Sequence, residues 1–474
     1  MPFFEDALVI GPSRPITNGP IAQSSITAAA VIIRPTMSTT IPYRISKDLP
    51  LIADADVIVV GGGPGGIGAA VMAARQGART VLIERYGCLG GMASVGEIHP
   101  FMPNHLGGEC LDKPIYVQWL TAMERYYPRR PPKVNDRPGE HLHGNLRHIS
   151  KEAAMLAAED LCLEAGVQVI YHHQLADVIV KDKRIDALVL LSKSGYSAAR
   201  AKAYVDGTGD GDLAARSGCE FEFGGPSGHC QPMTLCFKLS HVDVDRSPSV
   251  KEITQLYHEA RERGEIDCPR ENVLMFDWID PDVIHFNTTR IIHKSGVNGL
   301  ELSEAEIIGR RQMRQFLAFF RKHVSGYENA RLHSVAHHIG VRESRRIRGL
   351  AYITREDYIR CAKYPDGIAR VRYGIDIHNP DGSGTEHLAL PANEWYEIPF
   401  GCLVTKDVTN LLVGGRPISV DHAVHSSMRV MPPACTVGQA AGMGAAMASA
   451  GDGNAHKVDG TAVRKKLKDA GASL

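Results

Sequence analysis

The clearest hydrophobic pattern in the chain is a pair of short apolar runs on either side of a glycine-rich segment. Residues 55–60 (ADVIVV) form a continuous apolar run, which is typical of a buried parallel strand. GGGPGG follows directly, then the helix-compatible IGAAVMAARQGA, and then a second apolar run, RTVLIE, which ends at Glu84. This order of strand, turn, helix and strand predicts a βαβ unit of the kind that binds dinucleotides.

The small residues of this unit have distinct physical tasks. Gly61 permits the tight turn, Gly63 lets the backbone approach a pyrophosphate, and Gly66 and Ala70 allow the helix to pack closely on the strand. The N–H groups and the dipole of the helix N-terminus stabilise phosphate charge. Glu84 ends the second strand near the position from which an acid accepts hydrogen bonds from ribose hydroxyls. The fingerprint alone does not distinguish NAD from FAD.

The apolar pattern continues with further strands and helices. Residues 150–164 predict a helix that ends near Gly166, and residues 167–193 alternate like strands and a hairpin. Strands run into glycine turns twice more, at DGTGD (206–210) and at VGGRP (413–417). The segment RVMPPACTVGQAAGMGAAMASA then predicts a helix whose small residues let its N-terminus approach a cofactor closely.

These segments together resemble the FAD-dependent oxidoreductase family of the glutathione-reductase and fumarate-reductase flavoprotein superfamily. The resemblance implies an α/β fold: a Rossmann-like FAD-binding domain of the glutathione-reductase type with an inserted α+β substrate domain. Five stretches of sequence carry the resemblance, and the last two, towards the C-terminus, are the most specific. The matching stretches, in family order between residues 43 and 450, are DADVIVVGGGPGGIGAA, ERYGCLGGMAS, DGTGDGDLA, IGVRESRRIRG and GGRPISVDHAVHSSMRVMPPACTVGQAAG.

The resemblance also implies an FAD-binding domain assembled from separate parts of the chain. We expect its parts at residues 43–97, 150–222 and 400–450, a loop-rich excursion of the substrate domain at 98–149, and the substrate domain proper at 223–399. Residues 1–42 are predicted to be a disordered leader, so Met37 competes with Met1 as the start. Residues 451–474 predict a C-terminal surface helix. Residues 303–324 predict a helix with a capping box of Ser303 and Glu306 and core-facing Phe316 and Phe320.

Carried over motif by motif, the resemblance implies a set of cofactor contacts. The adenosine-diphosphate half of FAD is expected at the first glycine turn, Glu84 and Arg85, and the flavin near Gly90 and Gly91. Covalent attachment of the flavin stays open, although Cys88 is interpreted as a small turn residue. The expected contacts are Gly61, Gly63, Pro64, Gly65, Gly66, Glu84, Arg85, Gly90, Gly91, Met92, Ala93, Ala176, Gly209, Asp210, Gly415, Arg416, Met431, Gly438 and Gln439.

Two polar stretches are candidates for catalysis. In VRESRRIRG, Arg342 or Arg345 would bind an anionic substrate group or the flavin side of the site, unless these arginines only form ion pairs with acids such as Glu343. In DHAVHSSMR, His422 would carry a proton and Arg429 would neutralise a developing anion, although a structural histidine is the common alternative. In an extended segment Arg346 and Arg348 would share one face, with Arg345 opposite.

Composition narrows the class of protein. The 474 residues include 53 Lys and Arg and 53 Asp and Glu, so the chain lacks the basic surplus of a nucleic-acid-binding protein. No apolar run approaches the roughly 20 residues of a membrane span. The ten cysteines show no CxxC spacing, which favours reduced thiols in a cytoplasmic enzyme and indicates neither a metal site nor an iron–sulfur cluster.

The leading hypothesis is an FAD-dependent dehydrogenase or reductase that transfers a hydride between a small polar substrate and the flavin. The alternatives are a flavin-binding electron-transfer subunit that docks a protein redox partner, and an FAD monooxygenase. A disulfide or NAD(P)H oxidoreductase is disfavoured because a second GxGxxG is absent and Gly90–Gly91 are followed by Met92–Ala93, without cysteine. The electron acceptor stays unknown, and a homodimer is the default expectation.

Overall fold

A computed structural model describes residues 41–43, 46–127 and 150–474. The chain divides into two units, Met1–Tyr43 and Arg44–Leu474. Residues 41–43 are the described part of the first unit, and their side chains are exposed. The leader predicted over residues 1–42 therefore lies almost wholly outside the described residues, as does much of the predicted 98–149 excursion. The following paragraphs concern the second unit.

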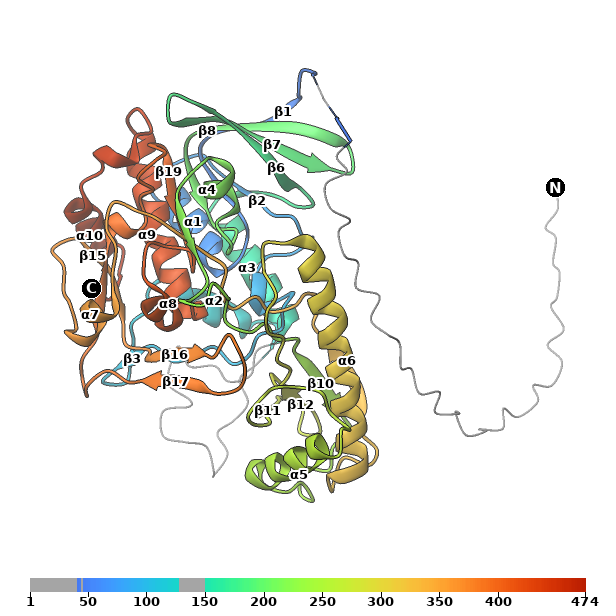
Figure 1. Cartoon of the computed structure of the whole chain (residues 1–474). Coiled ribbons are helices and arrows are strands. Elements are labelled where there is room, and N and C mark those ends of the chain that lie inside the picture. Colours follow the sequence, from blue (N-terminus) through green and yellow to red (C-terminus); the bar gives the residue numbers. More distant parts are fainter. Residues whose placement is uncertain (1–40, 44–45, 128–149) are drawn as a thin grey trace, which may run out of the picture. The chain divides into compact units, whose positions relative to one another are not determined.

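The described part of the second unit contains a seven-stranded sheet (Figure 1). Neighbouring pairs among β1, β2, β5, β8 and β19 run parallel, whereas β7 pairs antiparallel with both β6 and β8. The long β8 contacts β7 through its first half and β19 through its last three residues. The strands, in spatial order, are β5 (Gln168–Ile170), β2 (Thr80–Ile83), β1 (Leu51–Val60), β8 (Gly195–Asp206), β7 (Arg184–Ser192) and β6 (Gln174–Lys181), and β19 (Leu411–Val413) also pairs with β8.

The register of the parallel strands brings three glycine turns to one edge of the sheet. Val60 at the end of β1 and Val413 at the end of β19 both lie beside Asp206, the last residue of β8. Each of these strands is followed directly by glycine, at Gly61, Gly207 and Gly414. Ligands of open α/β sheets bind at the carboxyl ends of parallel strands, so this edge is where a site is expected.

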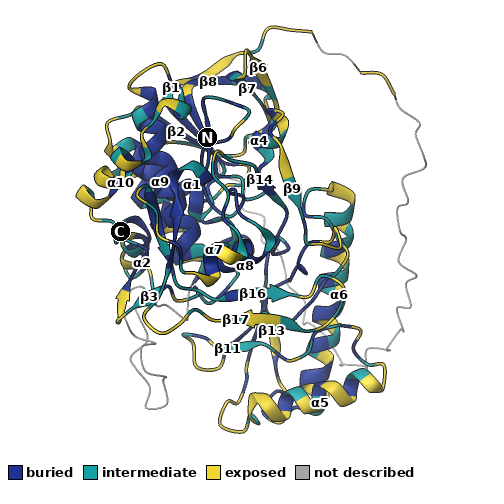
Figure 2. Ribbon diagram, turned by 60° about the vertical axis from the view of Figure 1, so that its left-hand side comes forward, coloured by how far each residue is buried: buried dark blue, intermediate teal, exposed yellow. Residues whose placement is uncertain are grey.

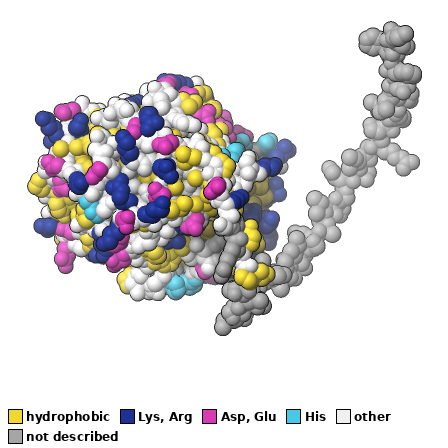
Figure 3. Space-filling view, turned by 90° about the horizontal axis from the view of Figure 1, so that it is seen from above, with side chains coloured by type: hydrophobic (Ala, Val, Ile, Leu, Met, Phe, Trp, Pro, Cys, Tyr) yellow, Lys and Arg dark blue, Asp and Glu magenta, His cyan; other side chains and the backbone are white. Residues whose placement is uncertain are grey.

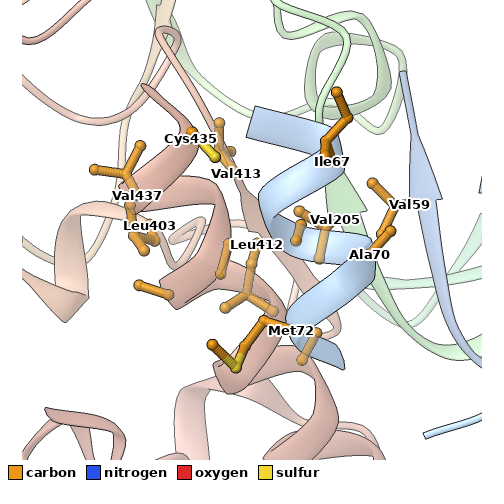
Figure 4. Close-up of a cluster of buried hydrophobic side chains, with 14 of the residues drawn as sticks. Val59, Ile67, Ala70, Met72, Val205, Leu403, Leu412, Val413, Cys435 and Val437 are labelled. Atoms are coloured by element: carbon orange, nitrogen blue, oxygen red, sulfur yellow. The ribbon is translucent and has the colours of Figure 1, made fainter. Parts of the chain in front are cut away.

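Two helices rich in small residues pack against each other beside this sheet, α1 (Pro64–Arg75) and α9 (Met431–Ser449). A Cβ at Gly68 would overlap the carbonyl oxygen of Cys435, and one at Gly442 would overlap that of Ala69, so the two backbones are in contact. Figure 2 shows both helices buried along most of their length. Figure 4 shows the apolar side chains between the helices and the strands, including Ile67, Met72 and Leu412.

A second, smaller sheet has its own hydrophobic core. Phe237, Phe286, Phe316 and Phe320 are buried there together, as predicted for the two phenylalanines of the long helix. That helix begins four residues earlier than predicted, so the expected cap at Ser303 is wrong. The cap is Asn298, because its side-chain oxygen accepts hydrogen bonds from the N–H groups of Leu300 and Glu301. The sheet order is β11 (Met275–Asp277), β12 (Ile284–Phe286), β10 (Phe237–Ser240) and β13 (Arg331–Val335), and α5 (Val250–Glu262) and α6 (Gly299–His323) contribute to the same core.

The remaining elements are two-stranded sheets and helices. The paired strands are β3 (His105–Leu106) with β4 (Glu109–Cys110), β9 (Phe221–Phe223) with β14 (Arg345–Ile347), β15 (Gly367–Val371) with β18 (Tyr396–Pro399), and β16 (Ile375–His378) with β17 (Thr385–Leu388). The other α-helices are α2 (Ile115–Met123), α3 (Lys151–Glu164), α4 (Asp212–Arg216), α7 (Arg355–Ile359), α8 (His422–Met428) and α10 (Gly460–Asp469).

The surface carries both signs of charge. Basic and acidic side chains are intermixed over the face shown in Figure 3, in agreement with the equal numbers of each in the sequence. Among the described residues, no helix combines the length and the apolar character needed to cross a membrane.

Candidate active site

The turn between β1 and α1 has the backbone that the glycine fingerprint predicts. Gly61 has a φ of +96°, and a Cβ at this position would lie 2.5 Å from the carbonyl oxygen of Gly207. Gly66 packs on Gly61 so closely that a Cβ would overlap its carbonyl oxygen. Gly63 caps α1 without a side-chain hydrogen bond, and Pro64 occupies the first turn. The first N–H groups of α1 are therefore not taken by a capping side chain.

Glu84 is held rigidly beside this turn. Its Oε2 accepts a hydrogen bond from the Gly62 N–H at 2.6 Å, and its Oε1 accepts one from the Tyr86 N–H at 2.8 Å. Burial raises the pKa of Glu84, and the two backbone donors oppose that shift. The carboxylate is thus oriented by backbone N–H groups next to α1, where remaining lone pairs can accept from ribose hydroxyls.

The second glycine turn, after β8, is organised around a buried carboxylate. The Thr208 hydroxyl donates to Asp206 Oδ1 at 2.7 Å, and the Ala214 N–H donates to Asp206 Oδ2 at 2.9 Å. Complete burial nevertheless raises the pKa of Asp206 to about 6. Asp206 therefore stabilises the turn itself rather than facing a ligand.

Asp210 and Arg416 join the second turn to the third turn, after β19. Arg416 forms an ion pair with Asp210 and donates to the carbonyl oxygen of Gly209. The Ser344 hydroxyl donates to Asp210 Oδ1 at 2.7 Å, and Arg345 donates to the Asp210 carbonyl oxygen at 3.1 Å. These contacts bring residues predicted as cofactor-binding into one hydrogen-bonded group.

A cavity of about 910 Å³ opens at this edge of the sheet. Most residues predicted to contact the cofactor line it, together with two of the four predicted catalytic residues. The predicted residues that line it are Gly61, Gly63, Pro64, Gly65, Glu84, Arg85, Gly91, Met92, Gly209, Asp210, Arg342, Gly415, Arg416, Arg429 and Met431. The predicted residues outside the lining are Gly66, Gly90, Ala93, Ala176, Arg345, His422, Gly438 and Gln439.

Some of the residues outside the lining support those that form it. A Cβ at Gly438 would overlap the carbonyl oxygen of Gly65, so this glycine sets the distance between α9 and α1. The amide of Gln439 donates to the Lys113 carbonyl oxygen at 3.0 Å and accepts from the Ile115 N–H at 3.3 Å, so it fixes the start of α2. Leu175, the strand neighbour of Ala176, lines the cavity instead of Ala176.

His422 lies in an ionic group behind the cavity wall. Its Nδ1 is 2.8 Å from Oε1 of Glu343, and Arg346 donates to the same oxygen at 2.7 Å. Although burial opposes the shift, the hydrogen bond from His422 and the nearby positive charges lower the pKa of Glu343 to about 2. Glu343 is therefore ionised at neutral pH and holds both partners.

The four arginines of residues 342–348 separate as an extended segment predicts. Arg346 and Arg348 both pair with Glu222, at 3.2 and 2.9 Å, which confirms that they share a face. Arg345 pairs with Asp212 at 2.9 Å on the other side. Arg342 alone of the four lines the cavity.

Guanidinium groups dominate a second part of the cavity lining. Arg342 donates to the Pro232 carbonyl oxygen, and Arg270 donates to the Asn272 side chain at 3.4 Å. Arg429 is 3.5 Å from Asp376, a carboxylate that lines the same region. Burial, together with the charges of Arg429 and Arg270, lowers the pKa of Arg342 well below its ordinary value. This part of the cavity carries an excess of positive charge.

His378 and Tyr373 lie beside this positive charge. His378 Nε2 is 3.5 Å from Asp376 Oδ2, and the Tyr373 hydroxyl donates to the same oxygen at 3.3 Å. Burial and the charge of Arg342 lower the pKa of His378 to about 3. His378 is therefore a neutral imidazole at physiological pH, able to donate or accept a hydrogen bond.

The sequence interpretation missed Arg270, Tyr373, Asp376 and His378. A faint signal existed for two of them, because Asp376 and His378 alternate with apolar residues in IDIH and so share one face of a strand. No local spacing connects them with Arg270 or Arg342, which come from distant parts of the chain.

The fold and the site define a dinucleotide-binding α/β protein. Three glycine turns, an uncapped helix N-terminus and a backbone-held acid surround a cavity whose volume is typical of cofactor sites. Residues 56–467 match the sequence model of the family "FAD dependent oxidoreductase", which is most of the chain. The chain therefore belongs to this family; it is an oxidoreductase whose cofactor is FAD, and the residues described above fit that cofactor.

Other similarities are short or distant. Mitochondrial dihydrolipoyl dehydrogenase from Rattus norvegicus is 48% identical over 54 residues, and that from Homo sapiens 49% over 53; each match spans 11% of this chain and only 10% of the relative. A flavin-dependent brominase, Bmp2, has a TM-score of 0.45 at 13% identity, covering 88% of this chain and 83% of its own. A geranylgeranyl bacteriochlorophyll reductase-like protein from Thermoplasma acidophilum has a TM-score of 0.40 at 14% identity, covering 88% and 84%. These similarities are too low to identify a substrate.

Proposed function

We propose that this protein transfers a hydride between FAD and a small anionic substrate bound beside Arg270, Arg342 and Arg429. The observation that carries the proposal is that Arg342, which is partly buried, and Arg270, which is buried, both line the cavity. Within the described residues, neither Arg342 nor Arg270 forms an ion pair with a carboxylate. Burying a guanidinium without a directly paired carboxylate is costly, and a bound carboxylate or similar anion would reduce that cost.

The bound flavin would supply the two-electron chemistry, and the protein would orient the substrate. Arg342 and Arg429 would hold the anionic group, with Asp376 keeping the Arg429 side chain in place. His378, which its low pKa keeps neutral, would orient the substrate through a hydrogen bond at its Nε2. The position of His422 beside Glu343 supports a structural role for that residue.

We also propose the glutathione-reductase type for the FAD-binding part, with a substrate domain at residues 223–399. The convergence of β1, β8 and β19 supports this, because it assembles one nucleotide site from three distant stretches. The separate core around Phe237 and Phe316 supports an inserted domain.

Anaerobic flavin reduction tests the proposed function. FAD-loaded enzyme should lose its flavin absorbance with hydroxy or amino acids, and much more slowly with the corresponding amides or esters. Arg342→Met should abolish this preference without loss of bound FAD. The matched control is Arg348→Met, because Arg348 pairs with Glu222 and does not line the cavity.

Two results would contradict the proposal. Equal reduction by charged and neutral analogues would show that the guanidinium groups do not select the substrate. Flavin reduction by a reduced nicotinamide cofactor alone, followed by oxygen-dependent hydroxylation of a neutral compound, would favour a monooxygenase.

A further inference from the structure

Two histidines and an aspartate from distant parts of the chain meet on the surface of the protein. His229 Nδ1 is 2.5 Å from Asp381 Oδ1, and His293 Nε2 is 3.4 Å from the same oxygen. The two imidazole rings are 4.6 Å apart between centroids, and one ligand atom from each residue lies within 4.8 Å of the others. All three side chains are about half exposed, so an ion can reach them from solvent.

The backbone around these residues fixes their positions. His229 closes a turn in which its carbonyl oxygen accepts from the Gly225 N–H at 2.8 Å. His293 has a φ of +55°, the left-handed region that few residues other than glycine adopt. Asp381 lies in the turn between β16 and β17, where its N–H donates to the Asn379 side chain at 3.0 Å.

A buried arginine anchors the turn that carries Asp381. Arg290 donates to the carbonyl oxygens of Asn379 and Gly384, both at 3.0 Å, at the two ends of that turn. Arg290 also pairs with Glu271 at 3.0 Å. Since His293 follows Arg290 by three residues, the same short segment presents one ligand and anchors another.

We propose that His229, His293 and Asp381 form a binding site for a divalent transition metal ion of the Zn²⁺ class. Two imidazoles and one carboxylate are ligands that Zn²⁺ prefers, with bonds of about 2.0–2.2 Å. Ligand atoms at tetrahedral corners around such an ion are about 3.3 Å apart. The 3.4 Å between His293 and Asp381 matches this spacing, and the 2.5 Å between His229 and Asp381 would lengthen when an ion replaces their direct contact. Water would take the fourth position. A simple surface ion pair with Asp381 needs only one histidine. It does not account for His293, the second histidine, whose backbone has a left-handed conformation.

The ion would act as a clamp on the cavity wall. None of the three ligands lines the cavity, so the metal would not contact the substrate or FAD. However, the hairpin that carries Asp381 contributes His378, Thr385 and His387 to the lining. The Thr385 hydroxyl also donates to Glu271 at 3.0 Å. An ion bound by Asp381, His229 and His293 would hold this hairpin against two loops of the chain. One loop carries His229 and precedes β10, and the other carries His293 and follows β12.

Zinc binding to the FAD-loaded enzyme tests the site. Equilibrium dialysis against Zn²⁺, followed by elemental analysis, should show one more bound equivalent in the wild-type protein than in Asp381→Asn or His229→Ala. His333→Ala is the matched control, since His333 is an exposed histidine of β13 and should leave the stoichiometry unchanged. FAD content and melting temperature would verify that each variant is folded, and Asp381→Asn, which is nearly isosteric, guards against misfolding of the others.

Hydrogen exchange tests the clamp separately from the activity. Adding Zn²⁺ should slow amide exchange several-fold in the peptide that covers residues 379–384, and this slowing should vanish in Asp381→Asn. Equal zinc stoichiometry in wild type and Asp381→Asn would overturn the site. Loss of zinc in the variant without any change in exchange on zinc binding would overturn the clamp.

Discussion

The contact between α9 and α1 makes a sharp prediction about Gly438. A Cβ at Gly438 would lie 2.6 Å from both the carbonyl carbon and the Cα of Gly65 and would overlap the carbonyl oxygen. Carbon atoms pack best at about 3.5–4.0 Å, so Gly438→Ala must separate the two backbones by roughly 1 Å. Gly65 lines the cavity in the first turn of α1, where the phosphates of FAD are expected. The substitution should therefore reduce both stability and affinity for FAD.

The size of the effect follows from two opposing contributions. Alanine is favoured over glycine within a helix by about 1 kcal/mol. Overpacking costs about 1–3 kcal/mol, and a clash with backbone places this site at the upper end. We therefore expect the free energy of unfolding to fall by about 2 kcal/mol. Displacement of the α1 N-terminus should also weaken FAD binding at least about tenfold, which corresponds to about 1.4 kcal/mol.

Gly442→Ala is the matched control on the same helix. Its Cβ would lie 2.7 Å from the carbonyl carbon of Ala69, an equally close clash with α1. Ala69 does not line the cavity, because it lies further along α1. Urea unfolding of the apoproteins should show similar losses for both variants, while quenching of FAD fluorescence should show weaker binding for Gly438→Ala only. Equal FAD affinities for the two variants would refute the inference that Gly438 positions the phosphate-binding turn.

Two further predictions concern buried carboxylates. Glu84→Gln should weaken FAD binding about tenfold in a fluorescence titration. The reason is that an amide oxygen can replace only one of the two acceptors for the Gly62 and Tyr86 N–H groups. A variant that binds FAD as tightly as the wild-type protein would contradict the role assigned to Glu84. Glu343→Gln should lower the free energy of unfolding at pH 7 by about 3 kcal/mol, because it removes the buried carboxylate charge that His422 and Arg346 both contact. The pKa of Glu343 is lowered from 4.5 to about 2 on folding, so its contribution is complete above pH 4.5 and declines as the pH falls towards 2. The difference between wild type and Glu343→Gln should therefore be about 1.4 kcal/mol smaller at pH 3.5 than at pH 7, and a constant difference would contradict this linkage.

The geometry of the glycine turns could be predicted because its requirements are local. Gly61, Gly63 and Gly66 act within one βαβ unit, so their spacing alone records the turn and the close packing. Glu84 was predictable for the same reason, since the length of the unit sets its place beside α1. Gly438 was predicted as a cofactor contact, whereas its small size serves the contact with Gly65. Its contact with FAD stays a prediction, and the contact with Gly65 gives a second reason for its small size.

Arg270, Asp376 and His378 could not be predicted because their partners are far apart in the sequence. Arg270 and Arg429 lie in separate segments, and Asp376 reaches Arg429 only through the folding of the β16–β17 hairpin. The same limit applies to His422, whose motif suggested the flavin and whose actual partner, Glu343, comes from a different stretch. The proposed metal ligands share this property, and no spacing rule for metal sites covers them.

The arginine-rich stretch shows where local pattern stops being sufficient. Alternation in an extended segment correctly separated Arg345 from Arg346 and Arg348, since side chains two residues apart share a face. It could not tell which arginine remains without an acid, because that depends on Glu222 and Asp212, which come from other elements. Once those acids are placed, Arg342 is the one arginine of this stretch left facing the cavity. The proposed binding of an anion therefore depends on the positions of the acids as much as on the arginines.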